Sequence, residues 1–470
     1  MEKLDYRKTF LIGFGFLASS LAWSLYNTFV PVLLNARYIQ DTAVIGFIMT
    51  IDNIFGVIFQ PLVGQVSDRT RTRFGKRMPY IMLGIPVCAF AFFFIPRTSS
   101  LAAMMAVIII FNLVMSLWRS PVVSLMPDLT PPFLRSKANG VINMMGGIGG
   151  IIAFLVGGML SNWGGDNIPF LMGSVVMILA LVILFIFIKE PDSRRLGRSL
   201  DTRESILARQ PIQSGALDQS DATTTADAAH AFSATTSAAG TLSDWAIPGE
   251  SLLNRIKERL GTTLLAGLSG PEKRSLAFLL LAIFSWFCGF NAIETFFSLY
   301  ATVHLGMKPG DAAIMLSLFS ITLIAFAIPS GILAGRVGRK RMIMIGLSGM
   351  VVMFLPMLFI GNVTVLRILL LLGGIFWACV NINSLPMVVE LATKERIGSF
   401  TGYYYFFSFS AAIISPTLFG WIRNLTDNYA TLFVYAVVAF LVALVCMVNV
   451  RHGEAKKPDA DSPAASVPAA

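Results

Sequence analysis

Charge is what this sequence has least of. Asp, Glu, Lys and Arg make up 13% of its 470 residues, against about 25% in an ordinary soluble domain. Hydrophobic residues make up 55%, and the mean hydropathy is +0.72. This composition excludes an ordinary soluble globular domain, so lipid is expected to solvate most of the chain.

Cysteine and histidine are also scarce. The four cysteines are Cys88, Cys288, Cys379 and Cys446. Each stands singly in an apolar stretch, so neither a disulfide framework nor a zinc site is predicted. The three histidines are His230, His304 and His452, and none lies in a predicted span. A membrane-embedded enzyme would need a nucleophile with a base, or a metal cluster. We therefore expect no enzyme, no metal and no cofactor.

Long apolar stretches recur along the chain, and a helix that crosses a bilayer needs about 20 such residues. The first set is Phe10 to Leu34, Val44 to Val66, Pro79 to Ile95, Leu101 to Leu125, Ala138 to Leu160 and Ile168 to Ile188. The second set is Ser275 to Tyr300, Ala312 to Ala334, Met342 to Ile360, Ile368 to Val389, Phe400 to Trp421 and Ala430 to Val450. They predict an all-α membrane protein with twelve transmembrane helices.

Basic residues are concentrated in the loops that follow the even-numbered spans. These residues are Arg69, Arg71, Arg73, Lys76, Arg77, Arg135, Lys137, Arg336, Arg339, Lys340, Arg341, Lys394 and Arg396. The opposite loops offer Arg37, Arg97, Lys308, Arg367 and Arg423. By the positive-inside rule both termini are cytoplasmic, in an integral protein of the cell (plasma) membrane. The formal net charge of +10 then needs no nucleic-acid partner.

The chain divides into four parts. Residues 1–188 and 275–450 each hold six spans. Residues 189–274 form a polar central loop, in which residues 210–241 are expected to be disordered. Apolar residues at helical spacing in residues 252–260 predict a short amphipathic helix on the membrane surface, with a structureless linker as the alternative. Residues 451–470 are predicted to be a disordered tail.

The two six-span parts repeat one pattern. With an offset of 267 residues, Asn27-Thr28-Phe29 falls on Glu294-Thr295-Phe296. At an offset of 263, Gly75-Lys76-Arg77 falls on Gly338-Arg339-Lys340, and at 262, Asp128-Leu129 falls on Glu390-Leu391. Such matches indicate duplication. Two parallel repeats place a substrate site between the halves near the middle of the membrane.

A basic motif follows the second span, running from Gly64 and Asp68 through the cluster Arg69 to Arg77. It resembles the loop motif of the major facilitator superfamily. With Gln60-Pro61 before it and Met78-Pro79 after it, it is similar to the branch of sucrose/proton symporters and solute carrier 45 proteins. The run from Trp118 to Asp128 also resembles the fourth helix of that branch. The alternative is a charged loop that only sets orientation.

The same resemblance bears on the coupling ion. Related glycoside-pentoside-hexuronide symporters, melibiose carriers among them, bind sodium with an Asp-x-x-x-Asp-Pro pattern in the second helix. Gly56 and Gln60 occupy the two acidic positions here. The resemblance therefore implies coupling to protons rather than sodium.

Three ionisable residues fall inside predicted spans, where each costs roughly 2.5 kcal/mol or more to insert. They are Asp52, Arg119 and Glu294. Asp52 and Glu294 either carry the proton or bind substrate, or they hydrogen-bond structurally to neighbours. Arg119 contacts the substrate or forms a gate ion pair. By depth along their helices, about 12 Å for Asp52 and about 27 Å for Arg119, the two are predicted to lie too far apart for an easy direct pair.

Aromatic and amide residues accumulate on the first, fourth, seventh and tenth spans. Sugars bind by stacking on rings and by hydrogen bonds to amides and carboxylates in an apolar cleft. The predicted substrate-binding residues are Trp23, Asn27, Trp118, Arg119, Asn291, Glu294, Trp377 and Asn381. The alternative for each of them is helix packing.

Acids also stand at the inner ends of two equivalent spans, beside basic loops. The predicted cytoplasmic gate comprises Gly64, Asp68, Arg69, Gly75, Lys76, Arg77, Asp128 and Glu390. The resemblance to sucrose symporters also implies a role in proton coupling for Asp128, beside Asp52 and Glu294.

The sequence thus favours a proton-coupled symporter of a sugar, such as sucrose, maltose or another α-glucoside, working by alternating access. Its partners would be a small-molecule substrate, protons and lipid. The alternatives are an efflux transporter of a drug or another metabolite on the same fold, or a membrane sugar sensor that transports nothing.

Overall fold

The computed structural model describes residues 4–131, 134–190, 269–392 and 397–453. Within these residues lie twelve helices that are long and apolar enough to cross a membrane. The first half holds α1 (Tyr6–Arg37), α2 (Thr42–Arg69), α3 (Met78–Phe94), α4 (Leu101–Leu129), α5 (Arg135–Gly164) and α6 (Asn167–Phe187). The second half holds α10 (Gly270–Leu299), α11 (Pro309–Val337), α12 (Arg339–Met357), α13 (Val363–Val389), α14 (Ile397–Thr426) and α15 (Thr431–Asn449).

The prediction of an all-α fold with twelve spans in two six-helix repeats is confirmed. The largest differences from the predicted boundaries are five residues, at the starts of α10 and α13 and at the end of α14. The helix α12 stops at Met357 rather than Ile360. Pro356 stands in its last turn, and the chain leaves the helix just beyond it. The predicted helix in residues 252–260 and disorder in residues 210–241 fall outside the described residues, as do Lys394, Arg396 and the tail from residue 454.

The helix ends follow local sequence signals. Asp41, Ser100 and Asn362 each accept hydrogen bonds from backbone N–H groups of the first turn of the helix that they precede. Ser269 and Glu272 form a capping box at the start of α10. Each of these caps satisfies donors that the first turn of a helix leaves free.

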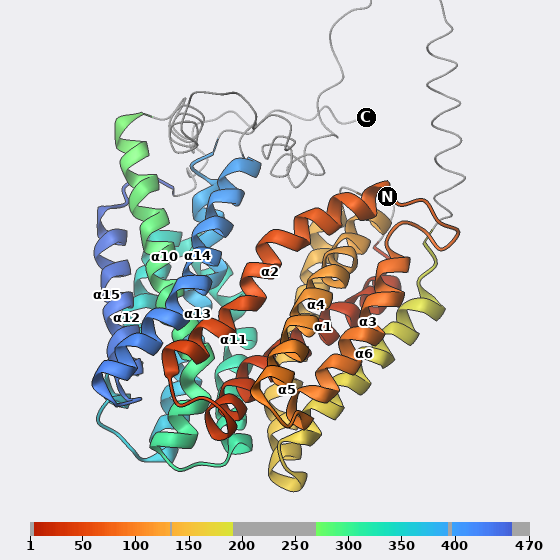
Figure 1. Cartoon of the computed structure of the whole chain (residues 1–470). Coiled ribbons are helices and arrows are strands. Elements are labelled where there is room, and N and C mark those ends of the chain that lie inside the picture. Colours follow the sequence, from red (N-terminus) through yellow and green to blue (C-terminus); the bar gives the residue numbers. More distant parts are fainter. Residues whose placement is uncertain (1–3, 132–133, 191–268, 393–396, 454–470) are drawn as a thin grey trace, which may run out of the picture.

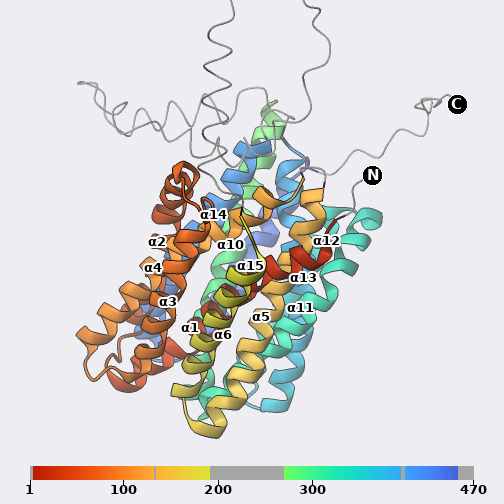
Figure 2. The same ribbon diagram turned by 90° about the vertical axis from the view of Figure 1, so that its right-hand side faces the viewer.

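The two halves pack by the same scheme. In the first half α1 packs against α5 and α6, and in the second α10 packs against α14 and α15. Between the halves the main contacts are those of α2 with α14, α5 with α11, and α1 with α10 (Figures 1 and 2). Residues on α1 and α10 therefore lie at the boundary where a substrate site between repeats is expected.

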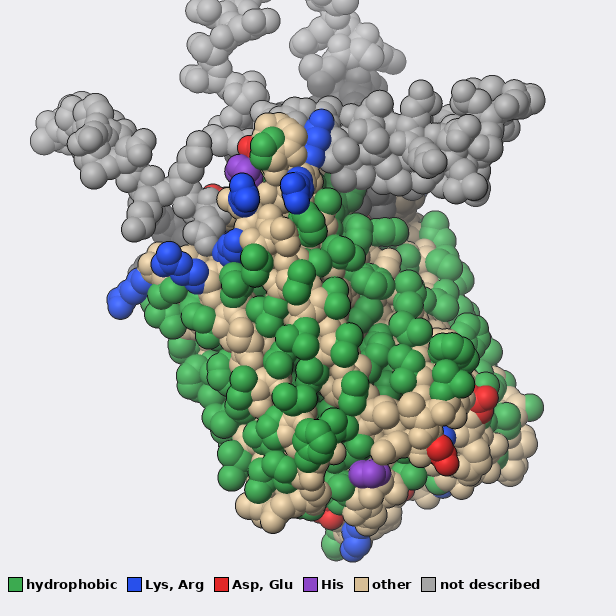
Figure 3. All heavy atoms as spheres, turned by 90° about the vertical axis from the view of Figure 1, so that its left-hand side faces the viewer, with side chains coloured by type: hydrophobic (Ala, Val, Ile, Leu, Met, Phe, Trp, Pro, Cys, Tyr) green, Lys and Arg blue, Asp and Glu red, His purple; other side chains and the backbone are tan. Residues whose placement is uncertain are grey.

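Both described chain ends lie at one end of the bundle, which we call the terminal face; the other end is the opposite face (Figure 1). In a side view, hydrophobic side chains cover the middle of the molecule, and most Lys and Arg side chains gather at the terminal face (Figure 3). The surface thus has the apolar band and the charged end that a membrane-spanning bundle requires.

The halves meet most closely at the opposite face. Hydrogen bonds join described residues of the two halves there, between α2 and α14 or its following loop and between α5 and α11. Toward the terminal face the ribbons of α2 and α14 diverge (Figure 1). A Cβ added at Gly140 of α5 or Gly335 of α11 would meet no atom within 4 Å. The boundary between the two halves is therefore closed at the opposite face and packs less tightly toward the terminal face.

Candidate functional site

Asp52 of α2 lies buried in the middle of the first half, with 4% of its surface exposed. Its Oδ2 accepts a hydrogen bond from Trp23 Nε1 of α1 at 2.6 Å. Its Oδ1 accepts from the backbone N and the side-chain Nδ2 of Asn53, at 2.6 and 2.8 Å. Both carboxylate oxygens thus have neutral donors, as a buried carboxylate requires.

Arg119 of α4 reaches the same place from another helix. Its guanidinium carbon lies 4.3 Å from the centre of the Trp23 ring, a cation–π contact. The indole of Trp23 therefore connects a carboxylate at its edge with a guanidinium at its face. We call Trp23, Asp52 and Arg119 the central cluster.

The prediction from helix depth that Asp52 and Arg119 lie too far apart for an easy direct pair is only partly right. No direct ion pair joins Asp52 and Arg119 within the described residues, as expected, yet they are close enough to interact electrostatically. Long helical side chains point back toward the N-terminus of their helix. Arg119 thereby extends up α4 toward the level of Asp52, and counting Cα positions misses that reach.

Glu294 of α10 completes the polar region from the second half. The Asn27 side chain of α1 lies next to its carboxyl group, and the charge of Asp52 acts on it as well. Asn27 and Glu294 are the residues that the repeat offset of 267 pairs. Repeat partners meet where the axis relating the halves passes, so this contact lies at the centre of the boundary between the halves.

Four predicted substrate-binding residues lie elsewhere. Trp118 is fully buried inside the first half, where its Cβ faces Gly84 of α3. Trp377 is buried behind Phe290, with ring centres 4.3 Å apart and planes at 3°. Asn291 donates to Phe287 of its own helix at 2.7 Å, and no hydrogen bond from the side chain of Asn381 is present in the described part of the chain. The contacts of Trp118, Trp377 and Asn291 thus lie within their own half, away from the central cluster.

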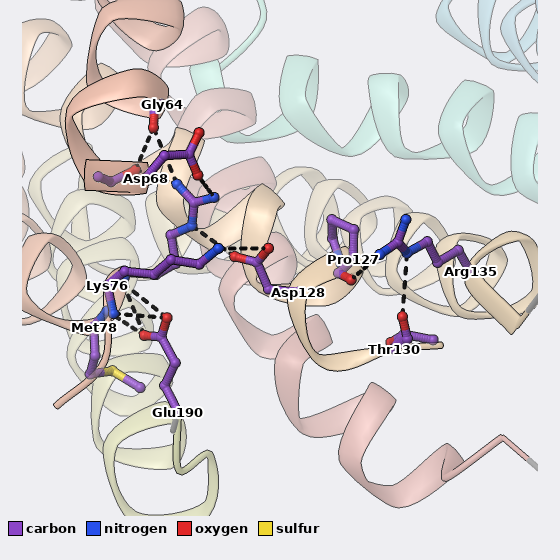
Figure 4. A network of polar contacts seen from close by, with 11 residues as sticks. Gly64, Asp68, Lys76, Met78, Pro127, Asp128, Thr130, Arg135 and Glu190 are labelled. Atoms are coloured by element: carbon purple, nitrogen blue, oxygen red, sulfur yellow. Dashed lines mark hydrogen bonds and ion pairs between the residues drawn. The ribbon is translucent and has the colours of Figure 1, made fainter. Parts of the chain in front are cut away.

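A second polar site lies at the terminal face, around Arg77 (Figure 4). Arg77 is 4% exposed. Its Nε donates to Asp128 of α4 at 2.9 Å, its Nη1 donates to the carbonyl of Gly64 at 3.3 Å and to Ser67, and its Nη2 pairs with Asp68. Lys76 Nζ lies 3.1 Å from Asp128. Arg69 is exposed at the surface, outside these contacts.

Glu190, just after α6, is the acidic residue of this network that the sequence argument missed. Its carboxylate accepts hydrogen bonds from the backbone N of Lys76, Arg77 and Met78 at 2.9 to 3.1 Å. A carboxylate at the start of α3 is favoured by the helix dipole and by free N–H groups. Gly75 has φ +99°, and a Cβ there would collide with Glu190. The signal available in the sequence was an acid directly after the sixth span.

The second half repeats part of this network. Arg339 Nη1 lies 2.9 Å from Glu390, and these residues are the repeat partners of Lys76 and Asp128. Gly338, the partner of Gly75, also has a positive φ of +102°. All these ion pairs join residues within one half, so each fastens the terminal ends of helices of its own repeat. Across the described residues, no three His, Cys, Asp or Glu side chains gather to form a metal site.

Two parallel six-helix repeats with polar residues at their boundary are the architecture of secondary transporters. Residues 12–310 and 279–469 match the family model of the Major Facilitator Superfamily. The chain belongs to this superfamily of transporters, as an integral membrane protein.

Several relatives are similar over part of the chain. An uncharacterized symporter of Synechocystis sp. is 27% identical over 167 residues, which are 33% of this chain and 31% of the relative. The isoprimeverose transporter of Lactiplantibacillus pentosus is 23% identical over 204 residues, 41% of this chain and 43% of the relative. A multidrug resistance protein of Dickeya zeae is 29% identical over 185 residues, 38% and 45%. The chain thus spans less than half the length of each of these relatives.

Solved structures match over nearly the whole chain. A nucleoside transporter superposes with a TM-score of 0.65 at 14% identity, covering 94% of this chain and 100% of that one. A D-xylose-proton symporter superposes with a TM-score of 0.63 at 15% identity, covering 95% and 98%. At such identities the likeness shows the fold alone.

Proposed function

We propose that this transporter carries a sugar together with a proton by alternating access. The observation that carries the proposal is the meeting of the central cluster with Asn27 and Glu294 at the boundary between the halves. Resemblance to the sucrose/proton symporter and solute carrier 45 branch makes sucrose, maltose and other α-glucosides the first substrates to test. The names of two similar proteins, an isoprimeverose transporter and a D-xylose-proton symporter, point the same way.

The residues at this boundary supply the chemistry that a sugar needs. Trp23 is half-buried and offers an aromatic ring to the apolar face of a sugar. Asn27 and Glu294, also half-buried, offer an amide and a carboxyl group to its hydroxyls. Arg119 makes no hydrogen bond to any residue that the structure describes, so its N–H donors are available to a ligand. A few polar groups in an apolar surrounding are the usual form of a small-molecule site.

Of the three acids considered for proton coupling, we assign the proton to Glu294. Asp128 pairs with both Lys76 and Arg77. Asp52 accepts three hydrogen bonds and lies near Arg119. Among the described residues Glu294 has the amide of Asn27 as its one hydrogen-bonding neighbour and has no cation beside it, so its proton is the one most readily exchanged when a sugar arrives or leaves. Asp52 then holds Trp23 and Arg119 in place.

The basic loops support placing the terminal face on the cytoplasmic side of the plasma membrane, and on that basis we interpret this conformation as closed to the outside. The gate residues at the terminal face would close the inside in the other conformation. In that step Asp68, Asp128 and Glu390 keep the helix ends of each half together while the halves rock.

Uptake into proteoliposomes tests the proposal. A panel of labelled mono- and disaccharides is offered with an inward proton gradient, with a sodium gradient at symmetrical pH, or with neither. We expect accumulation of a sugar with the proton gradient only. Glu294→Gln should keep sugar exchange and lose accumulation, because glutamine resembles the protonated acid but releases no proton. Glu272→Gln, the same change near the start of α10, is the matched control. Sodium-driven uptake, or accumulation by the Gln variant, would contradict the assignment.

An exporter of drugs is the second candidate, favoured by the similarity to a multidrug resistance protein. Such an exporter would lower the accumulation of a fluorescent cationic dye in cells and would transport none of the sugars. Dye efflux that depends on Glu294, with no sugar uptake, would replace the symport proposal.

A further inference from the structure

Two matching hydrogen bonds connect the halves at the opposite face. Asn424 Nδ2, near the end of α14, donates to Asp41 Oδ1 before α2 at 2.6 Å. Asn162 Nδ2, near the end of α5, donates to Asp311 Oδ1 in the first turn of α11 at 2.7 Å. In each case an asparagine at a helix end in one half binds an aspartate at a helix start in the other. We call these two pairs the twin clasps.

The clasps belong to a motif that both repeats contain. Asn162 and Asn424 are 262 residues apart, the offset that also relates Asp128 to Glu390. Four residues before each asparagine stands a glycine, in Gly158-Met-Leu-Ser-Asn162 and in Gly420-Trp-Ile-Arg-Asn424. Residues four apart lie on the same face of a helix. Each helix therefore presents a glycine and, one turn on, an asparagine to the other half.

The glycines allow the backbones to touch. A Cβ at Gly420 would collide with the carbonyl oxygen of Thr42 at the start of α2. A Cβ at Gly158 would lie 2.5 Å from the carbonyl oxygen of Gly310 at the start of α11. Close backbone approach at small residues is a common way for helices to associate in membranes. Here it brings each asparagine within reach of its aspartate.

The Asp41 clasp is the more elaborate of the two. Asp41 also accepts from the backbone N of Ala43 and Val44, which fixes the start of α2. Asn424 Oδ1 accepts from the backbone N of Thr42 at 3.1 Å, and the Thr42 hydroxyl lies 3.1 Å from that of Tyr429. The hydrogen bond from Asn424 is the main reason that the pKa of Asp41 lies below its ordinary value. The carboxylate is therefore ionised whenever the clasp is closed at neutral pH.

We infer that Asp41, Asn162, Asp311 and Asn424 are positioning residues for the transport cycle, which hold the opposite face closed and so set the balance between the two conformations. This inference rests on the proposed alternating access. The clasps must break when the opposite face opens, because the hydrogen bond of each pair joins one half to the other. Both pairs lie at exposed positions, so each hydrogen bond contributes only about 0.5 to 1.5 kcal/mol to the stability of the closed conformation. The contributions of the two pairs add, because both must break for the opposite face to open.

The test is a measurement of distance populations by electron spin resonance in lipid nanodiscs. Spin labels replace Trp163 and Phe359, which are 83% and 79% exposed in the first and second half at the opposite face. A second pair at Arg73 and Arg341 reports on the terminal face. The four native cysteines are buried and are replaced beforehand. Asn424 begins an Asn-Leu-Thr sequon, so the protein is made in a bacterial host that adds no N-glycan.

Removing one clasp by Asn162→Ala or Asn424→Ala should raise the ratio of open to closed opposite face about threefold, and removing both about tenfold. The terminal-face distances should shorten in step. The swap of Asp41→Asn with Asn424→Asp keeps one amide and one carboxylate in the clasp and reverses the direction of the hydrogen bond between them, so it should restore the wild-type distribution. Asn362→Ala, which removes a helix cap within one half at the same face, is the control and should change neither distance.

The outcomes separate this inference from the proposed function. Unchanged distances in the double variant, or a swap that fails to restore them, would overturn the role of the clasps. Neither result would bear on the proposed function, which the uptake of sugar into proteoliposomes tests separately. Gly158→Ala and Gly420→Ala give a second route to opening, since each added Cβ separates the backbones. If these variants also leave the opposite face closed, the inference is wrong even where an asparagine variant folds poorly.

Discussion

Arg77 offers the sharpest test of how the terminal face is built. It binds Gly64, Ser67 and Asp68 of α2 and Asp128 of α4, while Glu190 after α6 holds its backbone. One side chain thus connects three helices of the first half. Replacing Arg77 by Gln removes the guanidinium that these contacts share, and it leaves Asp128 with Lys76 alone.

The exposed fractions of the partners set the expected magnitude. The side chain of Asp68 is 59% exposed and that of Asp128 is 23% exposed. An exposed ion pair contributes about 0 to 1 kcal/mol, and a partly buried hydrogen bond between charged groups contributes about 1.5 to 3 kcal/mol. With the neutral acceptors Gly64 and Ser67 included, Arg77→Gln should lower the free energy of unfolding by about 3 kcal/mol. The coupling of Arg77 to Asp128 should account for about 1 to 2 kcal/mol of this loss.

A double-mutant cycle measures this coupling. Arg77→Gln, Asp128→Asn and the double variant are unfolded by denaturant in detergent micelles, and a thiol-reactive dye reports exposure of the four buried cysteines. Arg69→Gln, in the same loop but exposed, is the control and should change the free energy by less than about 0.5 kcal/mol. Strictly additive losses from Arg77 and Asp128 would refute the view that Arg77 acts through the acid.

Two further predictions concern the loop before α3 and the start of α2. In the same unfolding assay, Gly75→Ala should lower the free energy of unfolding by about 1 to 3 kcal/mol more than Gly165→Ala does. Both glycines have positive φ, but only at Gly75 would a Cβ collide with Glu190. Equal losses would show that the collision is relieved at no cost. The pKa of Asp41 is lowered in the folded protein, so its contribution to closure is present above its ordinary pKa of about 3.9 and is lost as the pH falls through the lowered value. The spin-label distances at the opposite face should therefore be constant between pH 5 and 8 in an Asp52→Asn, Glu294→Gln background. A change in that range would assign closure to another titrating group.

The sequence was sufficient for the fold because its signals are long and redundant. Each span needs only an apolar stretch of the right length, and the loops on either side confirm it by their charge. The repeat offsets also align residues that meet, or that make equivalent contacts, in the structure. Asn27 meets Glu294, and the ion pair of Lys76 with Asp128 recurs between Arg339 and Glu390. A duplicated gene repeats such contacts, so matching positions can be found by counting.

The rotation of each helix about its axis could not be predicted in the same way. Trp118 and Arg119 are adjacent on α4, and the aromatic residue was expected beside the arginine in the substrate site. The structure turns Trp118 toward Gly84 of α3 and leaves Arg119 over Trp23. A helix surrounded by protein on one side and lipid on the other is apolar on both sides, so its pattern does not distinguish them. The small residue on the neighbouring helix decides which way the tryptophan points.

The roles of Gly158 and Gly420 could not be predicted from the span in which each glycine lies. Each glycine looks ordinary in its own span, and each asparagine after it looks like a polar residue at a helix end. Their meaning depends on the offset of 262 residues together with the contact of each with the other half. Besides the contact of α1 with α10, the two halves meet mainly along two helix pairs, one on each side of the repeat axis. A clasp at one pair alone would leave the other pair without a hydrogen bond of this kind. The repeat therefore duplicates more than the fold, and it gives one clasp to each of these two helix pairs at the boundary, α2 with α14 and α5 with α11.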